Sequence, residues 1–133
     1  MSDQDILISI LSALNAQTDY AWTLNELPIE DSRQPAATLI PRESSNVIRK
    51  YKDGGAVSLL DFELHIISQA PDSLTRNNII EDLNDIGQSL TITLGSNKRL
   101  DKFDQTSNPA LYRSLENGQE EYAASYQLHW KRS

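Results

Sequence analysis

The stretch AVSLLDFELHIIS, residues 56–68, decides the fold class of this 133-residue chain. Apolar side chains occupy every second position, at Leu60, Phe62, Leu64 and Ile66, while the positions between them are mostly polar. A period of two residues is typical of a strand that is buried on one face. The sequence therefore predicts a long, half-buried β-strand here.

A tight turn leads into this strand. Residues 47–52 (VIRKYK) form another β-type run, and Asp53, Gly54 and Gly55 separate the two runs. Asp-Gly pairs supply the positive backbone angles that a hairpin turn needs. We therefore expect a long β-hairpin whose tip spans Lys52 to Gly55. The bases at 42, 49, 50 and 52 are interpreted as solvated strand charges.

Two amphipathic helices are expected on either side of the hairpin. The first begins at Ser2 or Asp3 and reaches about Asn15, because apolar residues recur there at helical spacing. The second begins at Asp72 or Ser73, and its apolar residues follow a 4-3-4 rhythm, at Ile79, Leu83, Ile86 and Leu90. Gly87 is a weak position in it, about 1 kcal/mol less favourable than alanine.

Three further strands are predicted, over 20–27, over 36–40 and at the end of the chain, with a polar loop over 29–35. In the last strand Tyr122, Ala124, Tyr126, Leu128 and Trp130 alternate with more polar residues. Its aromatic row fits core packing under the second helix, or alternatively a platform for a small ligand or peptide.

The segment 95–119 is polar and rich in turn residues. A connection of this length usually has a function or contains strands that the pattern hides. We expect residues 100–116 to form a mobile loop that becomes ordered at a contact with another subunit. The complete pattern predicts an α+β protein, with a mixed, mainly antiparallel sheet packed against two helices in one domain spanning residues 1–133.

Composition narrows the possible functions. The chain has no cysteine, which excludes disulfides and thiolate chemistry. Its formal net charge of −7 is the wrong sign for binding many phosphates, so we expect no sequence-specific nucleic-acid partner. No stretch approaches the roughly 20 apolar residues that a bilayer requires, and the start of the chain does not resemble a signal peptide. We expect an intracellular protein with no membrane partner.

No arrangement of side chains suggests catalysis. Asp61, Glu63 and His65 share one face of the predicted strand. Residues two apart on a strand are separated by roughly 7 Å, however, and the third residue, at twice that distance, cannot share one ion with the first. We interpret them as a solvated polar face. The expectation is therefore no enzyme, no cofactor and no metal.

The order of elements resembles that of the minor capsid and tail-terminator proteins of long-tailed bacteriophages, over nearly the whole chain. The resemblance depends on the helical start at 6–14, on RKYKDGG at 49–55 followed by FEL at 62–64, on the amphipathic helix 75–90, and on SNP at 107–109 before the aromatic terminal strand. It implies a tail-terminator-like fold and a subunit of a hexameric ring that caps the tail tube and docks to the head.

The partners that this resemblance implies are further copies of the chain, the tail tube protein and a head-completion protein. The resemblance also implies that the protein is located in the host bacterial cytoplasm during assembly and then at the virion neck or tail end. A head-completion or connector (stopper) protein of the same neck is the alternative within the class, and a small ligand- or peptide-binding module is the alternative outside it.

Two sets of residues are predicted to act in such a ring. We expect assembly contacts at the hairpin tip, in the loop 30–34 and in the segment 100–116, specifically at Asp31, Arg33, Lys52, Asp53, Gly54, Gly55 and Phe103. A channel for DNA should repel phosphates, which asks for acids at its wall. The acids expected to face the lumen are Asp101, Asp104, Glu116, Glu120 and Glu121.

Overall fold

The computed structural model describes residues 2–24, 36–42, 48–50, 56–69, 72–95, 98–115 and 118–132. This part of the chain contains two helices and seven strands, and the protein has an α+β fold. The helices are α1 (Ser2–Gln17) and α2 (Ser73–Ser89). The strands are β1 (Trp22–Leu24), β2 (Ala36–Pro41), β3 (Ile48–Lys50), β4 (Ala56–Ser68), β5 (Lys98–Gln105), β6 (Ala110–Ser114) and β7 (Glu120–Arg132).

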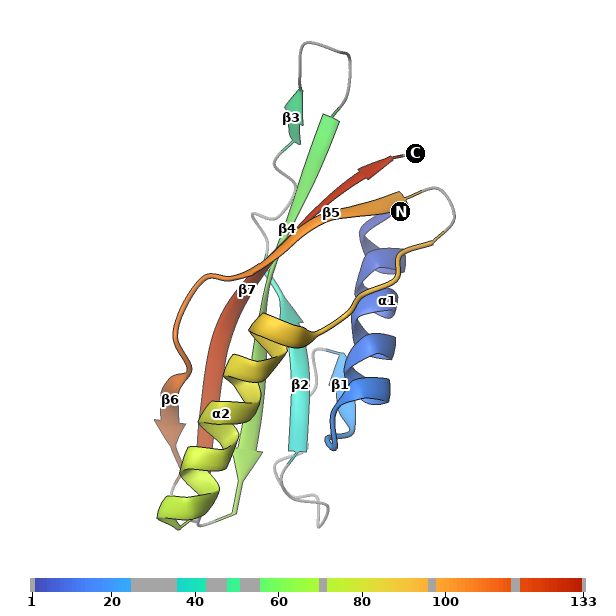
Figure 1. Ribbon diagram of the computed structural model, residues 1–133. Helices are drawn as coiled ribbons and strands as arrows, with labels where there is room; N and C mark the ends of the chain where they lie inside the picture. Colours follow the sequence, from blue (N-terminus) through green and yellow to red (C-terminus); the bar gives the residue numbers. More distant parts are fainter. Residues whose placement is uncertain are drawn as a thin grey trace.

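The described strands form one sheet in the order β1-β2-β4-β7-β5 (Figure 1). β3 pairs with β4 beyond the end of β2, and β6 pairs with β7 beyond the end of β5. Among these described strands only β1 and β2 run parallel, and the other pairs are antiparallel. The centre of the sheet is the pair β4 and β7, which runs from Val57 opposite Lys131 to Ser68 opposite Glu120. The predicted mixed, mainly antiparallel sheet is confirmed.

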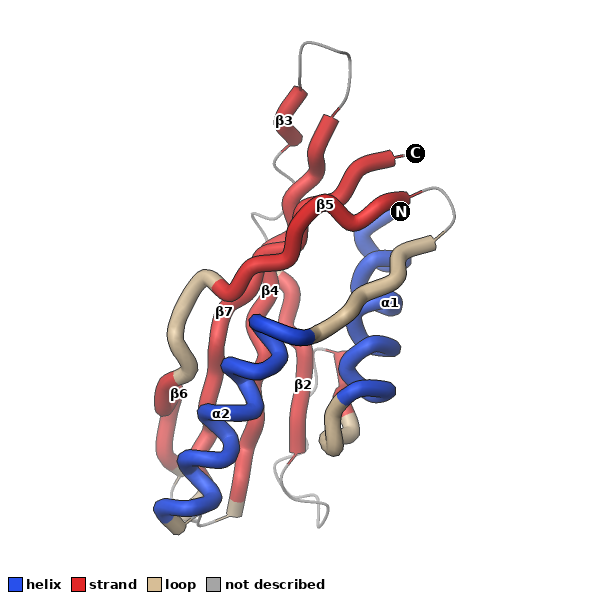
Figure 2. The backbone as a smooth tube through the Cα atoms, viewed as in Figure 1, coloured by secondary structure: helices blue, strands red, loops and turns tan. Residues whose placement is uncertain are grey.

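Both helices lie on the same face of the sheet (Figures 1 and 2). We call this the helical face and the opposite one the outer face. The alternation predicted for β4 places Leu60, Phe62, Leu64 and Ile66 in the core together with the alternating apolar residues of β7. The rings of Phe62, Phe103 and Tyr126 stack there with centroids 5.6–6.0 Å apart.

The two helices appear where the apolar spacing predicts them. α1 continues two residues beyond Asn15, to Gln17, and the Thr18 hydroxyl donates to the Leu14 carbonyl at its end. The Asp72 carboxylate accepts a hydrogen bond from the Thr75 backbone N–H at 2.8 Å, which makes Asp72 the N-cap of α2. The buried side of α2 carries Ile79, Leu83 and Ile86, as predicted.

The predicted hairpin is confirmed by the pairing of β3 with β4, in which Lys50 lies opposite Ala56. The tip of the hairpin lies outside the described residues. The same holds for the loop 29–35 and for the second half of the predicted strand 20–27. β2 matches the predicted strand 36–40 and includes Pro41, and the Arg42 backbone N–H then donates to the Asp61 carbonyl.

The prediction of a loop over 100–116 is wrong, because the structure places β5 and β6 there. The hidden strands escaped the pattern for two reasons. Register shifts between Leu100 and Lys102, and between Leu111 and Arg113, break the two-residue period. All of β6 is also exposed, so it has no apolar alternation to detect.

Gly87 is not merely a weak position in α2, because α2 packs closely against β5 there. A Cβ atom at Gly87 would lie 2.1 Å from Gln105 Oε1 and 2.8 Å from Gln105 Cβ. Real atoms do not approach so closely, so a side chain at this position would force α2 and β5 apart. Glycine allows the two elements to pack.

The outer face is also partly buried. Leu59 and Ile67, whose positions alternate with those of the core residues of β4, are buried, and His65 is only 2% exposed. The interpretation of Asp61, Glu63 and His65 as a solvated polar face is therefore wrong for His65. The physical reason is a group of charged side chains around His65, described below.

Candidate interaction surfaces

The predicted assembly contacts can be located only in part. Phe103 is described, and its ring is half-buried in the stack with Phe62 and Tyr126. The other six residues, Asp31, Arg33, Lys52, Asp53, Gly54 and Gly55, lie outside the described residues. Phe103 therefore contributes to the core of the subunit, and its part in assembly stays a prediction.

The acids predicted at the lumen differ in their surroundings. Glu121 is buried, so its assignment as a lumen-facing acid is wrong. Both carboxylate oxygens of Glu120 accept hydrogen bonds from the Arg76 guanidinium, at 2.9 and 3.0 Å, and this guanidinium lowers the pKa of Glu120. Glu116 lies outside the described residues.

Asp101 and Asp104 lie on β5, and each has a lysine nearby. Asp101 is 3.4 Å from the Lys131 ammonium, and Asp104 is 3.4 Å from the Lys102 ammonium. These pairs reduce the local negative charge that was expected to repel DNA. The lumen-facing role of Asp101 and Asp104 stays a prediction.

A group of charged residues joins β4, β6 and β7 on the outer face, with His65 and Glu121 buried at its centre and two arginines at its exposed rim. His65 Nδ1 lies 2.5 Å from Glu121 Oε2, and His65 Nε2 lies 2.8 Å from Glu63 Oε1. The Arg113 side chain donates to Glu121 Oε1 at 2.6 Å, and Arg42 forms an ion pair with Glu63. We call these five residues the His65 cluster.

The hydrogen bonds of the cluster fix the charge of His65. A carboxylate can only accept, so each ring nitrogen that faces one must donate, and only the imidazolium donates from both nitrogens. Burial alone would lower the pKa of His65, but the hydrogen bonds to Glu121 and then Glu63 outweigh it and raise this pKa. Burial would raise the pKa of Glu121, yet the hydrogen bonds from His65 and Arg113 lower it.

Strand β6 covers part of this cluster and exposes apolar side chains itself. The Tyr112 ring packs edge-on against the His65 ring, with centroids 4.8 Å apart, yet Tyr112 remains 59% exposed. Leu111 beside it is 50% exposed. β6 pairs only with β7 among the described strands, so it is an edge of the sheet. Edge strands with exposed apolar residues can pair with other chains.

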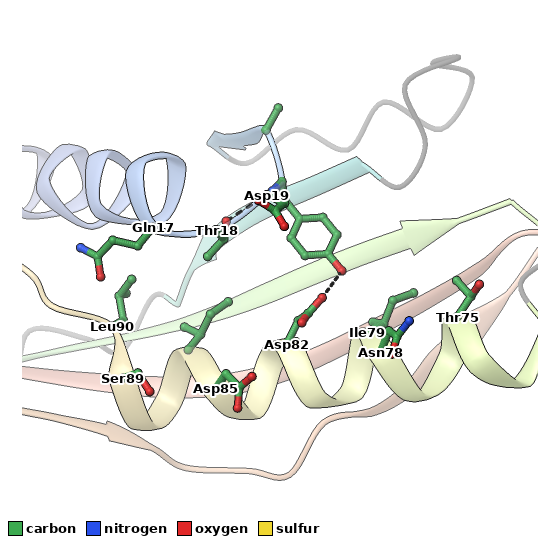
Figure 3. Close-up of a pocket in the computed structure, with 13 residues that line it drawn as sticks. Gln17, Thr18, Asp19, Thr75, Asn78, Ile79, Asp82, Asp85, Ser89 and Leu90 are labelled. Atoms are coloured by element: carbon green, nitrogen blue, oxygen red, sulfur yellow. Dashed lines mark hydrogen bonds between the residues drawn. The ribbon is translucent and has the colours of Figure 1, made fainter.

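A cleft of about 730 Å³ lies on the helical face, between α2 and the segment that follows α1 (Figure 3). Among the described residues, its lining includes three aspartates, Asp19, Asp82 and Asp85, and no lysine or arginine. Apolar side chains of α2, such as Ile79 and Ile86, also line it. The Tyr20 hydroxyl donates to Asp82 at 2.7 Å across the cleft, and burial, then this bond, raise the pKa of Tyr20. We call this the acidic cleft.

Basic residues gather at the end of the sheet where β4 begins and β7 ends. Arg49 lies opposite Val57, Val57 opposite Lys131, and Lys131 opposite Arg99, so these positions form one row across four strands. The next positions along three of these strands are Lys50, Arg132 and Lys98. Arg99 is exposed. We call Arg49, Arg99 and Lys131 the basic row.

These surfaces are difficult to predict from the sequence. Lys98–Arg99 and Lys131–Arg132 are ordinary basic pairs until antiparallel pairing of β5 with β7 brings them together. Asp19 is far from Asp82 in the sequence, and only the packing of α2 beside the end of α1 joins them. The one sequence signal for the acidic cleft is the helical spacing of Asp82 and Asp85, which places both carboxylates on the polar side of α2.

The structure does not support the ligand platform proposed for the terminal strand. Tyr122, Tyr126 and Trp130 are all buried, and the Tyr126 hydroxyl donates to the Leu83 carbonyl at 2.6 Å. The aromatic row therefore belongs to the core under α2, which is the first of the two interpretations given for it.

Among the described residues no group of His, Asp or Glu side chains could hold a metal ion. Neither described helix combines the length and apolar character that crossing a membrane requires.

Comparison with known proteins finds similarity of structure but not of sequence. No protein-family model and no curated protein matches the chain. Among solved structures, the fold is similar to a chain of a structure described as the virion of a native gene transfer agent particle. The match covers 98% of this chain and 97% of that chain, with a TM-score of 0.70 and 15% sequence identity. It shows that the two chains share a fold over their full length.

Proposed function

We propose that this protein is a structural subunit of a phage-like particle and has no catalytic activity. The observation that carries this proposal is the full-length fold similarity to a virion chain, with a TM-score of 0.70. The match covers 98% of this chain and 97% of that chain, so the similarity extends over nearly all of the fold described here. The resemblance of the element order to phage neck proteins supports the same class.

Within that class we propose a tail terminator, which forms a ring on the end of the tail tube and docks to the head. A ring needs two different contact surfaces on each subunit, because its interfaces are heterologous. The described part of the chain offers several uncovered surfaces on different sides, namely the β6 edge, the acidic cleft and the basic row. Asp101 and Asp104 are proposed to face the channel of this ring.

The test is to produce the protein together with the tail tube protein from the same genome and to examine the tubes by electron microscopy. A terminator should form a ring at one end of each tube and narrow the distribution of tube lengths. Tubes of unrestricted length without a ring would contradict the terminator role.

A second experiment separates the terminator from the head-completion alternative. Tails should be purified from cells in which head assembly is blocked, and heads from cells in which tail assembly is blocked. A terminator remains on the tails and is absent from the heads. A head-completion protein shows the opposite distribution.

A further inference from the structure

We propose that the acidic cleft of one copy of this chain receives the basic row of the next copy, and that this contact closes the ring. This inference rests on the proposed function, because it names the contact between neighbouring subunits. The occupant of the cleft is thus a second copy of the chain.

Charge complementarity is the first argument. The described residues of the cleft lining include three aspartates and no base. The basic row brings the positions of three bases together at one end of the sheet, where Asp101 offsets part of the charge of Lys131. Asp85 and Arg99 are both exposed, and neither has an ion-pair partner among the described residues. Copies with a net charge of −7 repel each other overall, so they can associate best where opposite charges meet.

Spacing is the second argument. Asp82 and Asp85 are three residues apart on a helix, which places their Cβ atoms about 5–6 Å apart. Arg99 and Lys131 are cross-strand partners, whose Cβ atoms lie about 4.5–5.5 Å apart. Two bases at this spacing can face two acids at nearly the same spacing, while the apolar side chains of Ile79 and Ile86 add contact area.

The two surfaces cannot meet within one molecule. β5 packs against α2 where Gln105 meets Gly87, and Gln105 lies opposite Tyr126 of β7. Lys131 is five residues further along β7, so it lies about 17 Å from Tyr126. In addition, Lys131 alternates with the core residue Trp130 and so belongs to the outer face, whereas the cleft lies on the helical face. A contact between unlike surfaces of two copies is heterologous, as a ring requires.

The absence of cysteine makes a covalent test possible. Copies carrying Asp85→Cys are mixed with copies carrying Arg99→Cys and are oxidised mildly. A disulfide requires Cα atoms within about 7 Å, so only a real contact allows it. We expect a mixed disulfide dimer in several-fold higher yield than with the control Glu81→Cys, which is an exposed acid of α2 outside the cleft lining. Equal yields would overturn the contact.

Charge reversal tests the same contact without cross-linking. At about 0.1 M salt, where charges are screened beyond about 10 Å, sedimentation should show that Arg99→Glu or Asp85→Arg alone weakens self-association about fivefold or more. A mixture of the two variants should recover it, because alternating copies restore opposite charges at every interface. Glu81→Arg, with the same change in net charge as Asp85→Arg, should not be rescued by Arg99→Glu.

The outcomes separate this contact from the proposed function. Native protein that caps tubes while the disulfide yields equal the control would overturn the contact and leave the terminator role. Selective disulfides together with uncapped tubes would support the contact and overturn the terminator role. Selective occupation of the cleft by a basic peptide of the tube protein, with no disulfide between copies, would assign the cleft to another partner and overturn the contact.

Discussion

The two faces of the sheet are buried in different ways. On the helical face, β4 and β7 present apolar and aromatic side chains, and the helices cover them. On the outer face, the same two strands bury His65 and Glu121, which hydrogen-bond to each other. Burial of apolar area is favourable by itself, whereas burial of a charge is tolerated only when its partners are present. The helical face should therefore tolerate exchange of one apolar side chain for another, and the outer face should depend on specific partners.

The largest effect should follow from Phe62→Ala on the helical face. Phe62 is fully buried against Phe103 and Tyr126, and loss of a core phenylalanine costs about 3–5 kcal/mol. Urea denaturation measures this loss as a lower midpoint. Tyr112→Ala, which removes an exposed aromatic ring from the outer face, is the matched control and should cost about 1 kcal/mol. Equal losses of unfolding free energy in the two variants would contradict the distinction between the helical face and the outer face.

The second effect concerns Glu121→Gln, which keeps the shape of the side chain and removes its charge. His65 and Arg113 would then each lose a carboxylate partner, and a buried polar group without its partner costs about 1–3 kcal/mol. The free energy of unfolding from urea titration checks this. Glu120→Gln, at a carboxylate that is bonded to Arg76 and less buried, should cost less. A Glu121→Gln protein as stable as the native one would show that the cluster contributes nothing.

These two faces also explain how much the sequence could predict. Core positions follow a fixed period, so the strands β4 and β7, the helix α2 and most of the apolar core could be predicted from their spacing. The His65 cluster could not, because Glu121 and Arg113 come close to His65 only through pairings with β7 and β6. The same reason hid the basic row and the acidic cleft, each of which combines residues from separate elements. Local pattern predicts which residues are apolar and buried, but the pairing of strands decides which charges meet.

A third prediction concerns the contact between α2 and β5. Gly87→Ala gains about 1 kcal/mol of helix propensity, but the new Cβ would overlap Gln105, and overpacking costs about 1–3 kcal/mol. We expect a net loss of about 1 kcal/mol in thermal or urea denaturation. Gly95→Ala is the control, because no atom of the described residues beyond its chain neighbours lies within 4 Å of the added Cβ, and it should not destabilise the protein. The double change Gly87→Ala with Gln105→Gly should recover stability, and a stabilising Gly87→Ala would show that α2 and β5 separate easily.

The smallest effect should be a dependence of stability on pH that comes from the outer face. The pKa of His65 is raised in the folded state, so its contribution is complete below the ordinary pKa of about 6.5 and is lost as pH rises through the folded-state value. The pKa of Glu121 is lowered, so its contribution is present above about 4.3 and is lost as pH falls through the folded-state value. The groups that face His65 are Glu63 from β4, Glu121 from β7, and Arg113 with Tyr112 from β6.

The melting temperature should therefore be highest between about pH 4.3 and 6.5 and should fall as the pH is raised further. Glu121→Gln should weaken this fall, because the main partner of the imidazolium is gone, while His129→Gln should preserve it, because His65 is unchanged. A native protein whose melting temperature rises from pH 6 to pH 9 would contradict the imidazolium form of His65.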